Sequence, residues 1–445
     1  MAKSKINYVC NSCGESYAKW SGKCDNCGNW NTLVEFKEAK IRGKAAGGEK
    51  LKAQKLKDVS FPTTNDRFKT GIAPADEVLG GGIVPASVVL LAGEPGIGKS
   101  TILLQMAAAL AKNHRVLYVS GEESVNQIKL RAERLGVGSE DLELAASTSA
   151  NDISSTMSSD DYDLVIVDSI QTVSVAEVDS SAGSVSQITN CSQLLQATAK
   201  KAGTALMMIG HVTKEGSIAG PKILEHLVDV VLYLEGDRYG GFKVLRGVKN
   251  RFGSTNEVGL FEMANEGMIA VDNPSAALLA ERQTSDGSVV LATMEGTRAM
   301  LVEVQALVSK SSFGYPKRTA VGIDPNRLNL LIAVLNQRTK LNLSEHDVYV
   351  NIVGGIKITE PAADLAVCMA VASAAKGMQL KSDAVVFGEV GLSGEVRRVN
   401  NIDKRISEAQ KLGFKNAIAP KSGKNDKFVI PVATLRDGLN QFLSK

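Results

Sequence analysis

The segment from Gly93 to Ser100 reads GEPGIGKS and matches the pattern G-x-x-x-x-G-K-[ST] in full. In this pattern the glycines let main-chain N–H groups wrap phosphates, and the start of the following helix adds a positive field. Lys99 is expected to reach the β- and γ-phosphates of ATP, and Ser100 to hold Mg²⁺. The predicted nucleotide-binding residues are Gly93, Glu94, Pro95, Gly96, Ile97, Gly98, Lys99, Ser100 and Thr101.

Polar side chains at the ends of predicted strands supply the remaining chemistry. Asp168 ends the apolar run Leu164–Val167 and is expected to meet Mg²⁺ through water. Glu122 is the candidate base that polarises the attacking water, with Glu123 as its rival, because sequence does not tell which of the two faces the nucleotide. His211 ends the fourth predicted strand, where it either senses the γ-phosphate or has a plain structural role.

Four of the six cysteines lie near the amino terminus, in two C-x2-C pairs that ten residues separate: Cys10, Cys13, Cys24 and Cys27. This spacing is typical of a closed tetrahedral Zn²⁺ site with four thiolates, which staples a small fold and leaves no position for catalysis. Gly14 and Gly28 suit the positive φ of such turns. Trp20 and Trp30 are expected to cover a unit too small to build its own core. We interpret this unit as a recognition or docking module.

Short apolar strands that alternate with helical stretches must position the nucleotide residues, which indicates a parallel, doubly wound α/β sheet. The helical stretch Ile102–Ala111 follows the first strand. The predicted strands are Val88–Gly93, Arg115–Ser124, Asp163–Thr172, Ala205–Lys214 and Val228–Glu235, with a closing antiparallel pair at Phe242–Lys249 and Val258–Met263. After a break near Pro274, a second α/β unit is expected. Its predicted strands are Gly287–Thr293, Arg298–Leu307, Asp347–Val353 and Ala384–Gly388, and its helices are Pro325–Thr339, Ala363–Lys376 and Ile402–Leu412.

The composition of the 445 residues, 44% hydrophobic and 22% charged, is that of a soluble globular protein and excludes wholesale disorder. No run approaches the length of a membrane span, and the longest apolar stretch, Leu365–Ala375, is expected to be a buried helix. The amino terminus lacks a signal-peptide pattern, so we expect a cytoplasmic protein. The net charge is +3, but residues 37–57 hold eight Lys/Arg against two Glu. That stretch either touches nucleic acid or acidic lipid, or is a solvated tether.

Residues 249–253 read KNRFG. This segment, combined with the cysteine pairs and the phosphate-binding loop, resembles the bacterial RadA (Sms) family of DNA repair and recombination ATPases over essentially the whole chain. The resemblance implies an α/β protein with a four-Cys zinc finger (1–36), a basic linker (37–57), a RecA-like P-loop NTPase core (58–272) and a Lon-protease-like α/β domain (273–445). It also implies a hexameric ring with ATP at the subunit interface, where Lys249 and Arg251 act in trans. Without the resemblance, these two residues are routine surface charge.

The resemblance implies a DNA-dependent ATPase, a motor on single-stranded DNA that drives branch migration of recombination intermediates. Its implied partners are single-stranded and branched DNA and a RecA-type recombinase. The loops Ser174–Ser186 and Lys214–Lys222 are expected to line the channel, with Lys214 and Lys222 contacting phosphates. The alternative is a nucleotide-switched assembly factor that binds DNA without moving along it.

The Lon-like domain raises a third hypothesis, an ATP-dependent serine protease. The family's catalytic serine corresponds to Ala362 here, and its catalytic lysine corresponds to Asp403. Because alanine has no nucleophile and aspartate cannot act as the lysine base, this dyad is expected to be inactive. We interpret the domain as a scaffold that binds duplex DNA and supports the ring. Its candidate contacts are Lys310, Lys317, Arg318, Arg397, Arg398 and Lys404. Cys191 and Cys368 are expected to be core residues.

Overall fold

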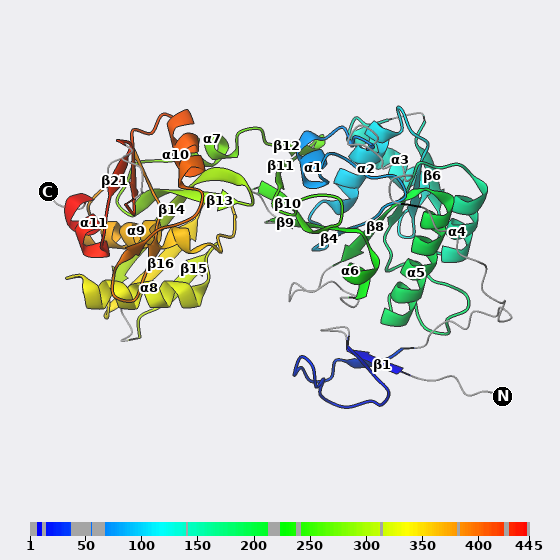
Figure 1. The fold of residues 1–445 in the computed structure, drawn as a ribbon, viewed down its shortest axis with the longest axis horizontal. Helices are drawn as coiled ribbons and strands as arrows, with labels where there is room; N and C mark the ends of the chain where they lie inside the picture. Colours follow the sequence, from blue (N-terminus) through cyan, green and yellow to red (C-terminus); the bar gives the residue numbers. More distant parts are fainter. Residues whose placement is uncertain are drawn as a thin grey trace. The chain divides into compact units, whose positions relative to one another are not determined.

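The fold was analysed in a computed structural model, which describes residues 7–10, 15–36, 55, 67–138, 141–211, 223–236, 242–311, 315–380, 383–421 and 427–442. The chain divides between Ala270 and Val271 into two compact units, with the short stretch Tyr239–Phe242 counted with the second. Figure 1 draws the first unit in blue to green and the second in green to red. Within the described residues, no helix is long and apolar enough to cross a membrane.

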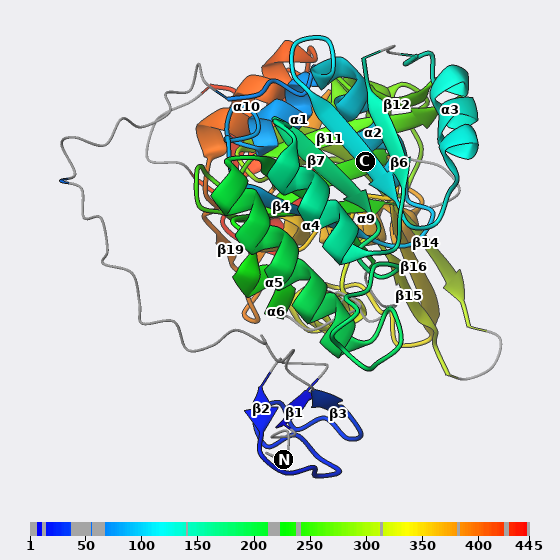
Figure 2. The same cartoon turned by 90° about the vertical axis from the view of Figure 1, so that its right-hand side faces the viewer.

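The amino-terminal residues form a small antiparallel sheet of three strands in the order β2-β1-β3 (Figure 2). The strands are β1 (Asn7–Cys10), β2 (Ser16–Tyr17) and β3 (Leu33–Phe36). Cys10, Cys24 and Leu33 form a small buried cluster in this sheet, against which Tyr8 and Tyr17 pack, and Val9 is buried as well.

The expectation that Trp20 and Trp30 cover this small unit is wrong. Trp20 is 57% exposed and Trp30 is 70% exposed. Tyr8 and Tyr17, which pair across strands β1 and β2, pack on the buried cysteines instead. Gly28 has φ of +75°, as its turn position predicted, whereas Gly14 lies outside the described residues.

The first unit is built on a nine-stranded sheet in the order β12-β11-β10-β9-β4-β8-β7-β5-β6. The run from β9 to β6 is parallel, which confirms the doubly wound α/β core. The strands are β4 (Val88–Gly93), β5 (Val116–Ser120), β6 (Glu143–Ala146), β7 (Leu164–Asp168), β8 (Ala205–His211), β9 (Val230–Gly236), β10 (Phe242–Asn250), β11 (Val258–Ala264) and β12 (Gly267–Ala270). The helices are α1 (Ala73–Val78), α2 (Lys99–Leu110), α3 (Val125–Arg134), α4 (Ala150–Ser159), α5 (Val185–Ala202) and α6 (Ile223–Leu227).

Two separate apolar cores cover the two faces of this sheet. One contains Leu103 and Leu104 of α2 and Ile128 of α3, and the other contains Ile153 of α4 and Leu195 of α5. Alternate residues of the central strands enter one core or the other, since successive side chains of a strand point to opposite faces. Helices on both faces explain why the central strands are apolar along their whole length.

The second unit contains a seven-stranded mixed sheet in the order β15-β16-β14-β13-β17-β20-β21 and a two-stranded pair, β18 and β19. The strands are β13 (Ser288–Glu295), β14 (Arg298–Lys310), β15 (Arg318–Val321), β16 (His346–Ile352), β17 (Ala384–Val386), β18 (Glu389–Val390), β19 (Val396–Arg397), β20 (Asn416–Ala419) and β21 (Val429–Pro431). The helices are α7 (Pro274–Leu279), α8 (Pro325–Arg338), α9 (Asp364–Lys376), α10 (Ile402–Lys411), α11 (Leu435–Phe442) and the 3₁₀ turn η3 (Pro361–Ala363).

Pro274 does not interrupt the pattern but begins α7, where Asn273 caps the helix through its side chain. Proline suits the first helical turn because its missing N–H would have no partner there. Helix α9 is buried from Asp364 to Ser373, as expected for the apolar stretch that begins at Leu365.

Candidate nucleotide site and metal centre

The predicted phosphate-binding loop connects β4 to α2, at the carboxyl end of a central parallel strand. Gly98 caps α2 in the left-handed region, with φ of +114°. The positive φ of Gly98 favours glycine, and a Cβ there would also displace the methyl groups of Met263 and Met268, which would lie 2.6 Å from it. The loop therefore leads directly into a helix start, where main-chain N–H groups attract anions.

Lys99 is buried, and its ammonium nitrogen donates hydrogen bonds of 2.9 Å to the carbonyl oxygens of Gly93 and Glu94. These contacts hold the positive charge inside the turn of the loop. A bound phosphate chain would meet this charge together with the helix N–H groups.

Asp168 ends β7, and its Oδ2 accepts a hydrogen bond of 2.6 Å from the hydroxyl of Tyr118 in β5. Arg131 of α3 donates to the same hydroxyl and lies 3.9 Å from the carboxylate. Burial and the negative charge of Asp168 raise the pKa of Tyr118 well above its usual value, so the phenol remains a neutral donor. Sequence analysis missed Tyr118 and Arg131. An aromatic hydroxyl inside the otherwise aliphatic strand VLYVS was the available signal.

The two candidate bases, Glu122 and Glu123, face different partners. Glu123 forms an ion pair of 2.6 Å with Arg131. Glu122 accepts a hydrogen bond of 2.7 Å from the Ser169 hydroxyl, lies 3.8 Å from His211 Nε2 and stays 48% exposed. Glu122 is thus the one of the two that adjoins the ends of β7 and β8.

His211 pairs in register with Gly93 across β8 and β4, so it lies beside the first residue of the loop. Burial lowers the pKa of His211 and the charge of Lys99 lowers it further, while Glu122 opposes them. The ring is therefore held in its neutral form near pH 7. The structure brings Lys99, Glu122, Asp168 and His211 to one edge of the sheet.

Lys249 and Arg251 lie at the other edge of the same sheet. Asn250 of β10 pairs with Val230 of β9. Val230 in turn pairs with Val89, near the start of β4. Four residue steps of β4, from Val89 to Gly93 at the start of the phosphate-binding loop, separate the two edges, about 13 Å of extended chain. Within one chain, the KNRFG segment does not reach the nucleotide loop.

The two basic residues of KNRFG differ in their surroundings. Lys249 donates hydrogen bonds of 2.6 and 2.7 Å to the carbonyl oxygens of Glu225 and Val228, and burial lowers its pKa. Arg251 is 56% exposed and lies 3.3 Å from Asp229, whose other oxygen accepts from the N–H of Val88. Lys249 thus closes the end of α6, whereas Arg251 presents its guanidinium at the surface.

The remaining residues of the motif shape its turn. The side chain of Asn250 accepts from the N–H of Phe252, and Arg67 donates to the Phe252 carbonyl. A Cβ at Gly253 would lie 3.2 Å from the Cα of Gly80, so this position favours glycine. Sequence analysis named only the basic residues and missed this structural role.

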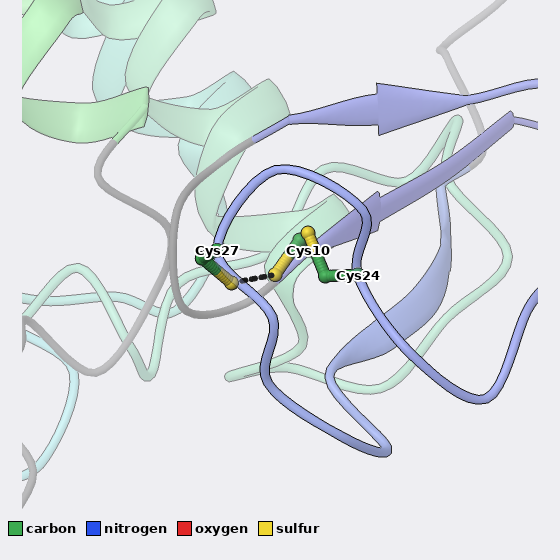
Figure 3. A group of neighbouring side chains, drawn as sticks. All are labelled: Cys10, Cys24 and Cys27. Carbon is green, nitrogen blue, oxygen red and sulfur yellow. Dashed lines mark hydrogen bonds between the residues drawn. The ribbon is translucent and has the colours of Figure 1, made fainter.

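The described cysteines of the amino-terminal sheet gather at one point (Figure 3). The sulfur atoms of Cys10, Cys24 and Cys27 all lie within 4.8 Å of one another, and those of Cys10 and Cys27 are 3.7 Å apart. Ligands of a tetrahedral zinc ion with Zn–S bonds of about 2.3 Å are roughly 3.8 Å apart. The spacing therefore fits Zn²⁺. Cys13, the fourth predicted ligand, lies outside the described residues.

Of the two loops predicted to line a channel, the structure describes only the first. Lys214 and Lys222 lie outside the described residues. The loop Ser174–Ser186 is pinned by the Gln187 amide, whose nitrogen donates to the carbonyl oxygens of Val175, Val178 and Ser180. This loop contains no lysine or arginine, so phosphate contacts from it would have to use hydroxyl and main-chain groups.

The second unit contains partly buried ion pairs near Ala362 and Asp403, the two positions that correspond to the protease dyad. Ala362 is buried in η3 and Asp403 is exposed in the first turn of α10. Close by in sequence, Arg405 is 1% exposed and binds Glu360 through two hydrogen bonds of 2.9 and 2.6 Å. A second pair joins Arg327 to Asp364. Glu360, Arg327 and Asp364 line a cleft of about 500 Å³.

Comparison with known proteins agrees with this architecture. A family described as "AAA domain" matches residues 52–217, "Rubredoxin metal binding domain" matches 8–35, and "Subunit ChlI of Mg-chelatase" matches 315–423. The DNA repair protein RadA of Bacillus subtilis is 50% identical, covering 94% of this chain and 93% of its own. The RadA proteins of Halalkalibacterium halodurans and Escherichia coli are 47% and 44% identical and cover at least 99% of both chains.

Among solved structures, the RadB recombinase covers 46% of this chain and 100% of its own, with a TM-score of 0.38 and 22% identity. A KaiC-like protein from the hyperthermophilic archaeon Pyrococcus horikoshii covers 46% of this chain and 98% of its own, with a TM-score of 0.40 and 18% identity.

The P-loop, the doubly wound sheet and the flanking modules define a P-loop ATPase with a RecA-like core, a zinc ribbon and a ChlI- and Lon-like second unit. At 44–50% identity over nearly the full length of its relatives, the chain belongs to the RadA family of DNA repair proteins.

Proposed function

We propose that this protein is a cytoplasmic, DNA-dependent ATPase of recombinational DNA repair. In this proposal it forms a ring-shaped homo-hexamer that moves on single-stranded DNA and drives branch migration or unwinding of recombination intermediates. Its partners are single-stranded and branched DNA and a RecA-type recombinase. Family membership supports the DNA repair setting, and the P-loop supports ATP hydrolysis.

The observation that carries the proposal is the separation of two charged groups within one chain. Lys99, Glu122, Asp168 and His211 lie at one edge of the sheet, and the exposed Arg251 lies at the other. An arginine that completes the charge around a γ-phosphate must come within hydrogen-bond reach of it. Arg251 can do so only from a neighbouring copy, and a repeated head-to-tail contact of this kind gives a ring where its rotation closes and a filament where it does not.

Each chain contributes defined groups to the reaction. The loop N–H groups and Lys99 bind the phosphates, and Ser100 and Asp168 would hold Mg²⁺, which supplies charge neutralisation between the phosphates. Glu122 is placed to accept a proton from the attacking water, with Ser169 orienting its carboxylate at 2.7 Å. The neutral ring of His211, next to Glu122, is proposed to sense whether a γ-phosphate is bound.

The first experiment measures ATP turnover with and without single-stranded DNA, for the natural protein and for Lys99→Ala. We expect strong stimulation by DNA that the substitution abolishes. Thermal unfolding of Lys99→Ala controls for loss of the two hydrogen bonds that Lys99 makes to its loop. Turnover that ignores DNA would favour the alternative, a nucleotide-switched assembly factor without translocation.

A mixing experiment tests the contribution of Arg251 in trans. Lys99→Ala and Arg251→Ala are each expected to be inactive alone. Mixed in equal amounts, they regain activity, because about a quarter of the interfaces in a randomly mixed head-to-tail ring combine an intact loop with an intact arginine. Arg134→Ala, which removes an exposed arginine at the end of α3, is the control. A mixture no more active than its components would refute the assignment of Arg251.

The second unit is proposed to bind duplex DNA and to lack proteolytic activity. Lys317, Arg397 and Lys404 are exposed, as binding to phosphates requires. Ala362 and Asp403 give no serine–lysine dyad, and the nearby Arg405 is committed to Glu360. Incubation with an unfolded protein substrate and ATP, followed by electrophoresis, should leave the substrate intact.

A further inference from the structure

The two tryptophans of the amino-terminal sheet are exposed, although large aromatic side chains normally bury most of their surface. They are the only tryptophans among the 445 residues. Neither belongs to the small core of the sheet. Their exposure is therefore not a by-product of core packing in this unit.

Trp20 and Trp30 flank the same glycine. A Cβ added at Gly22 would lie 3.7 Å from Cζ3 of Trp30 and 4.0 Å from Cη2 of Trp20. The six-membered rings of both indoles thus lie close to the same glycine. We call this surface, formed by Trp20, Gly22 and Trp30, the indole surface.

Hydrogen bonds fix the indole surface in place. Trp20 Nε1 donates to the carbonyl oxygen of Leu33 at 3.1 Å. The N–H of Asn31, next to Trp30, donates to the carbonyl of Gly22 at 2.7 Å. Because the backbone around both rings is held, binding a flat ligand here orders few additional groups, which lowers the entropic cost of binding.

Positive charge adjoins the two rings. Lys23 pairs with Trp30 in an isolated antiparallel bridge, and its ammonium lies 5.9 Å from the centre of the indole ring. Lys19, next to Trp20, is exposed. In the sequence, the 21 residues that follow the sheet, 37–57, hold eight Lys/Arg against two Glu. Flat apolar rings beside cations match the chemistry of a nucleobase next to a phosphate.

We propose that the indole surface stacks unpaired bases of single-stranded nucleic acid, while Lys19 and Lys23 contact the phosphates. Paired bases in a duplex do not expose their faces, so the surface selects single strands. The inference rests on the proposed DNA-linked function and assigns part of DNA recognition to the zinc ribbon. A protein partner that docks on the same rings is the competing occupant, and the test below separates the two.

Tryptophan fluorescence reports this surface alone, because no other tryptophan exists in the chain. The full-length, zinc-loaded protein is titrated with oligothymidylate, and then with a duplex of the same length. We expect quenching of tryptophan emission by the single strand and not by the duplex. Trp30→Ala should weaken binding of a fluorescein-labelled oligothymidylate about 10- to 100-fold, and Trp30→Phe, which keeps a stacking ring, by only a few-fold.

Matched controls make the result decisive. Leu130→Ala removes an equally exposed apolar side chain from α3 and should leave binding unchanged. Zinc content and circular dichroism verify that Trp30→Ala keeps its ribbon. Unchanged emission at oligonucleotide concentrations that saturate the anisotropy signal would overturn stacking at this surface. Equal quenching by duplex, or equal binding by Trp30→Ala, would also overturn it.

The failure of this inference is distinguishable from failure of the proposed function. DNA-stimulated ATP turnover that survives in Trp30→Ala, with unchanged oligonucleotide affinity, would refute the indole surface and leave the ATPase proposal intact. Quenching of tryptophan emission by a recombinase but not by oligothymidylate would identify the competing protein occupant.

Discussion

Each of the two units contains a cluster of charged side chains, and the two clusters differ in the groups that contact these charges. At the P-loop edge of the first unit, Lys99 is held by main-chain carbonyls and Glu122 by a serine hydroxyl. In the second unit, Arg405 is paired with Glu360 and Arg327 with Asp364. The groups that hold Lys99 and Glu122 in these contacts are neutral, whereas those that hold Arg405 and Arg327 are oppositely charged.

This difference distinguishes a charged side chain that can still bind a ligand from one that stabilises the fold through an ion pair. A carboxylate bound by a guanidinium cannot also neutralise a bound cation, whereas one that accepts from a hydroxyl still can. Burial alone would raise the pKa of Glu360, but the hydrogen bonds and charge of Arg405 lower it below its usual value. Glu360 and Asp364 are therefore each bound by an arginine of the same unit, as expected for charges that stabilise the fold.

The largest effect is expected from Glu122→Gln. The substitution removes the proton-accepting oxygen of the proposed base and should lower kcat for ATP about 10²- to 10⁴-fold, with nucleotide affinity nearly unchanged. Glu123→Gln is the matched control, since it loses the ion pair of 2.6 Å with Arg131 but no group facing the nucleotide. Steady-state ATP turnover measures both. The reverse order, with Glu123→Gln the more damaging change, would exchange the roles of the two residues.

The next effect is on stability, in the second unit. Arg405→Met leaves Glu360 as a half-buried carboxylate without its ion-pair partner, which should cost about 3–5 kcal/mol of the free energy of unfolding. Arg397→Met, whose arginine is 59% exposed and paired with Glu395, should cost under ~1 kcal/mol. Urea unfolding followed by circular dichroism measures both. Equal small losses would mean that the Arg405 pair does not stabilise the fold, and the contrast drawn here would fail.

Much of the fold could be predicted because its central strands are apolar along their whole length. The strand Val88–Gly93 was predicted with its observed bounds. The edge strand β6 was missed because its burial pattern runs exposed, half-buried, half-buried, exposed. Such a short, half-solvated segment has no periodicity that distinguishes it from a loop. The strands β15, β20 and β21 also escaped prediction, because three or four residues are too few for a pattern to stand out.

The candidate site also has a part that the sequence predicts and a part that it does not. The P-loop could be read from sequence because its residues are consecutive. Tyr118 lies 50 positions before Asp168, and Glu360 lies 45 positions before Arg405, so these pairs exist only in three dimensions. The tryptophans of the ribbon show the limit of composition, because an aromatic residue in a small unit either covers the core or presents a surface, and only the fold decides which.

A smaller effect is expected from Tyr118→Phe. The change removes a hydrogen bond of 2.6 Å to Asp168, so the carboxylate loses a group that orients it toward Mg²⁺. We expect the Mg²⁺ concentration that half-saturates ATP turnover to rise about 10-fold. Tyr162→Phe is the matched control, because it removes a bond of equal length to Glu143 in the same sheet, away from the P-loop. A similar Mg²⁺ dependence in both variants would show that Tyr118 acts on stability alone.

The smallest effect concerns pH and tests whether the P-loop edge disfavours an added positive charge. Burial and the charge of Lys99 lower the pKa of His211 in the folded state. As the pH falls, His211 is therefore protonated in the unfolded chain before it is protonated in the folded protein. His211 therefore supports folding above its usual pKa of about 6.5, and this support is lost as the pH falls from there toward the lower folded value. The melting temperature of His211→Asn should decline less between pH 7.5 and pH 5.5 than that of the natural protein. His226→Asn, which changes an exposed histidine on α6, should follow the natural protein. Parallel declines in all three proteins would show that protonation of His211 does not destabilise the fold. The P-loop edge would then tolerate an added positive charge as an exposed surface does.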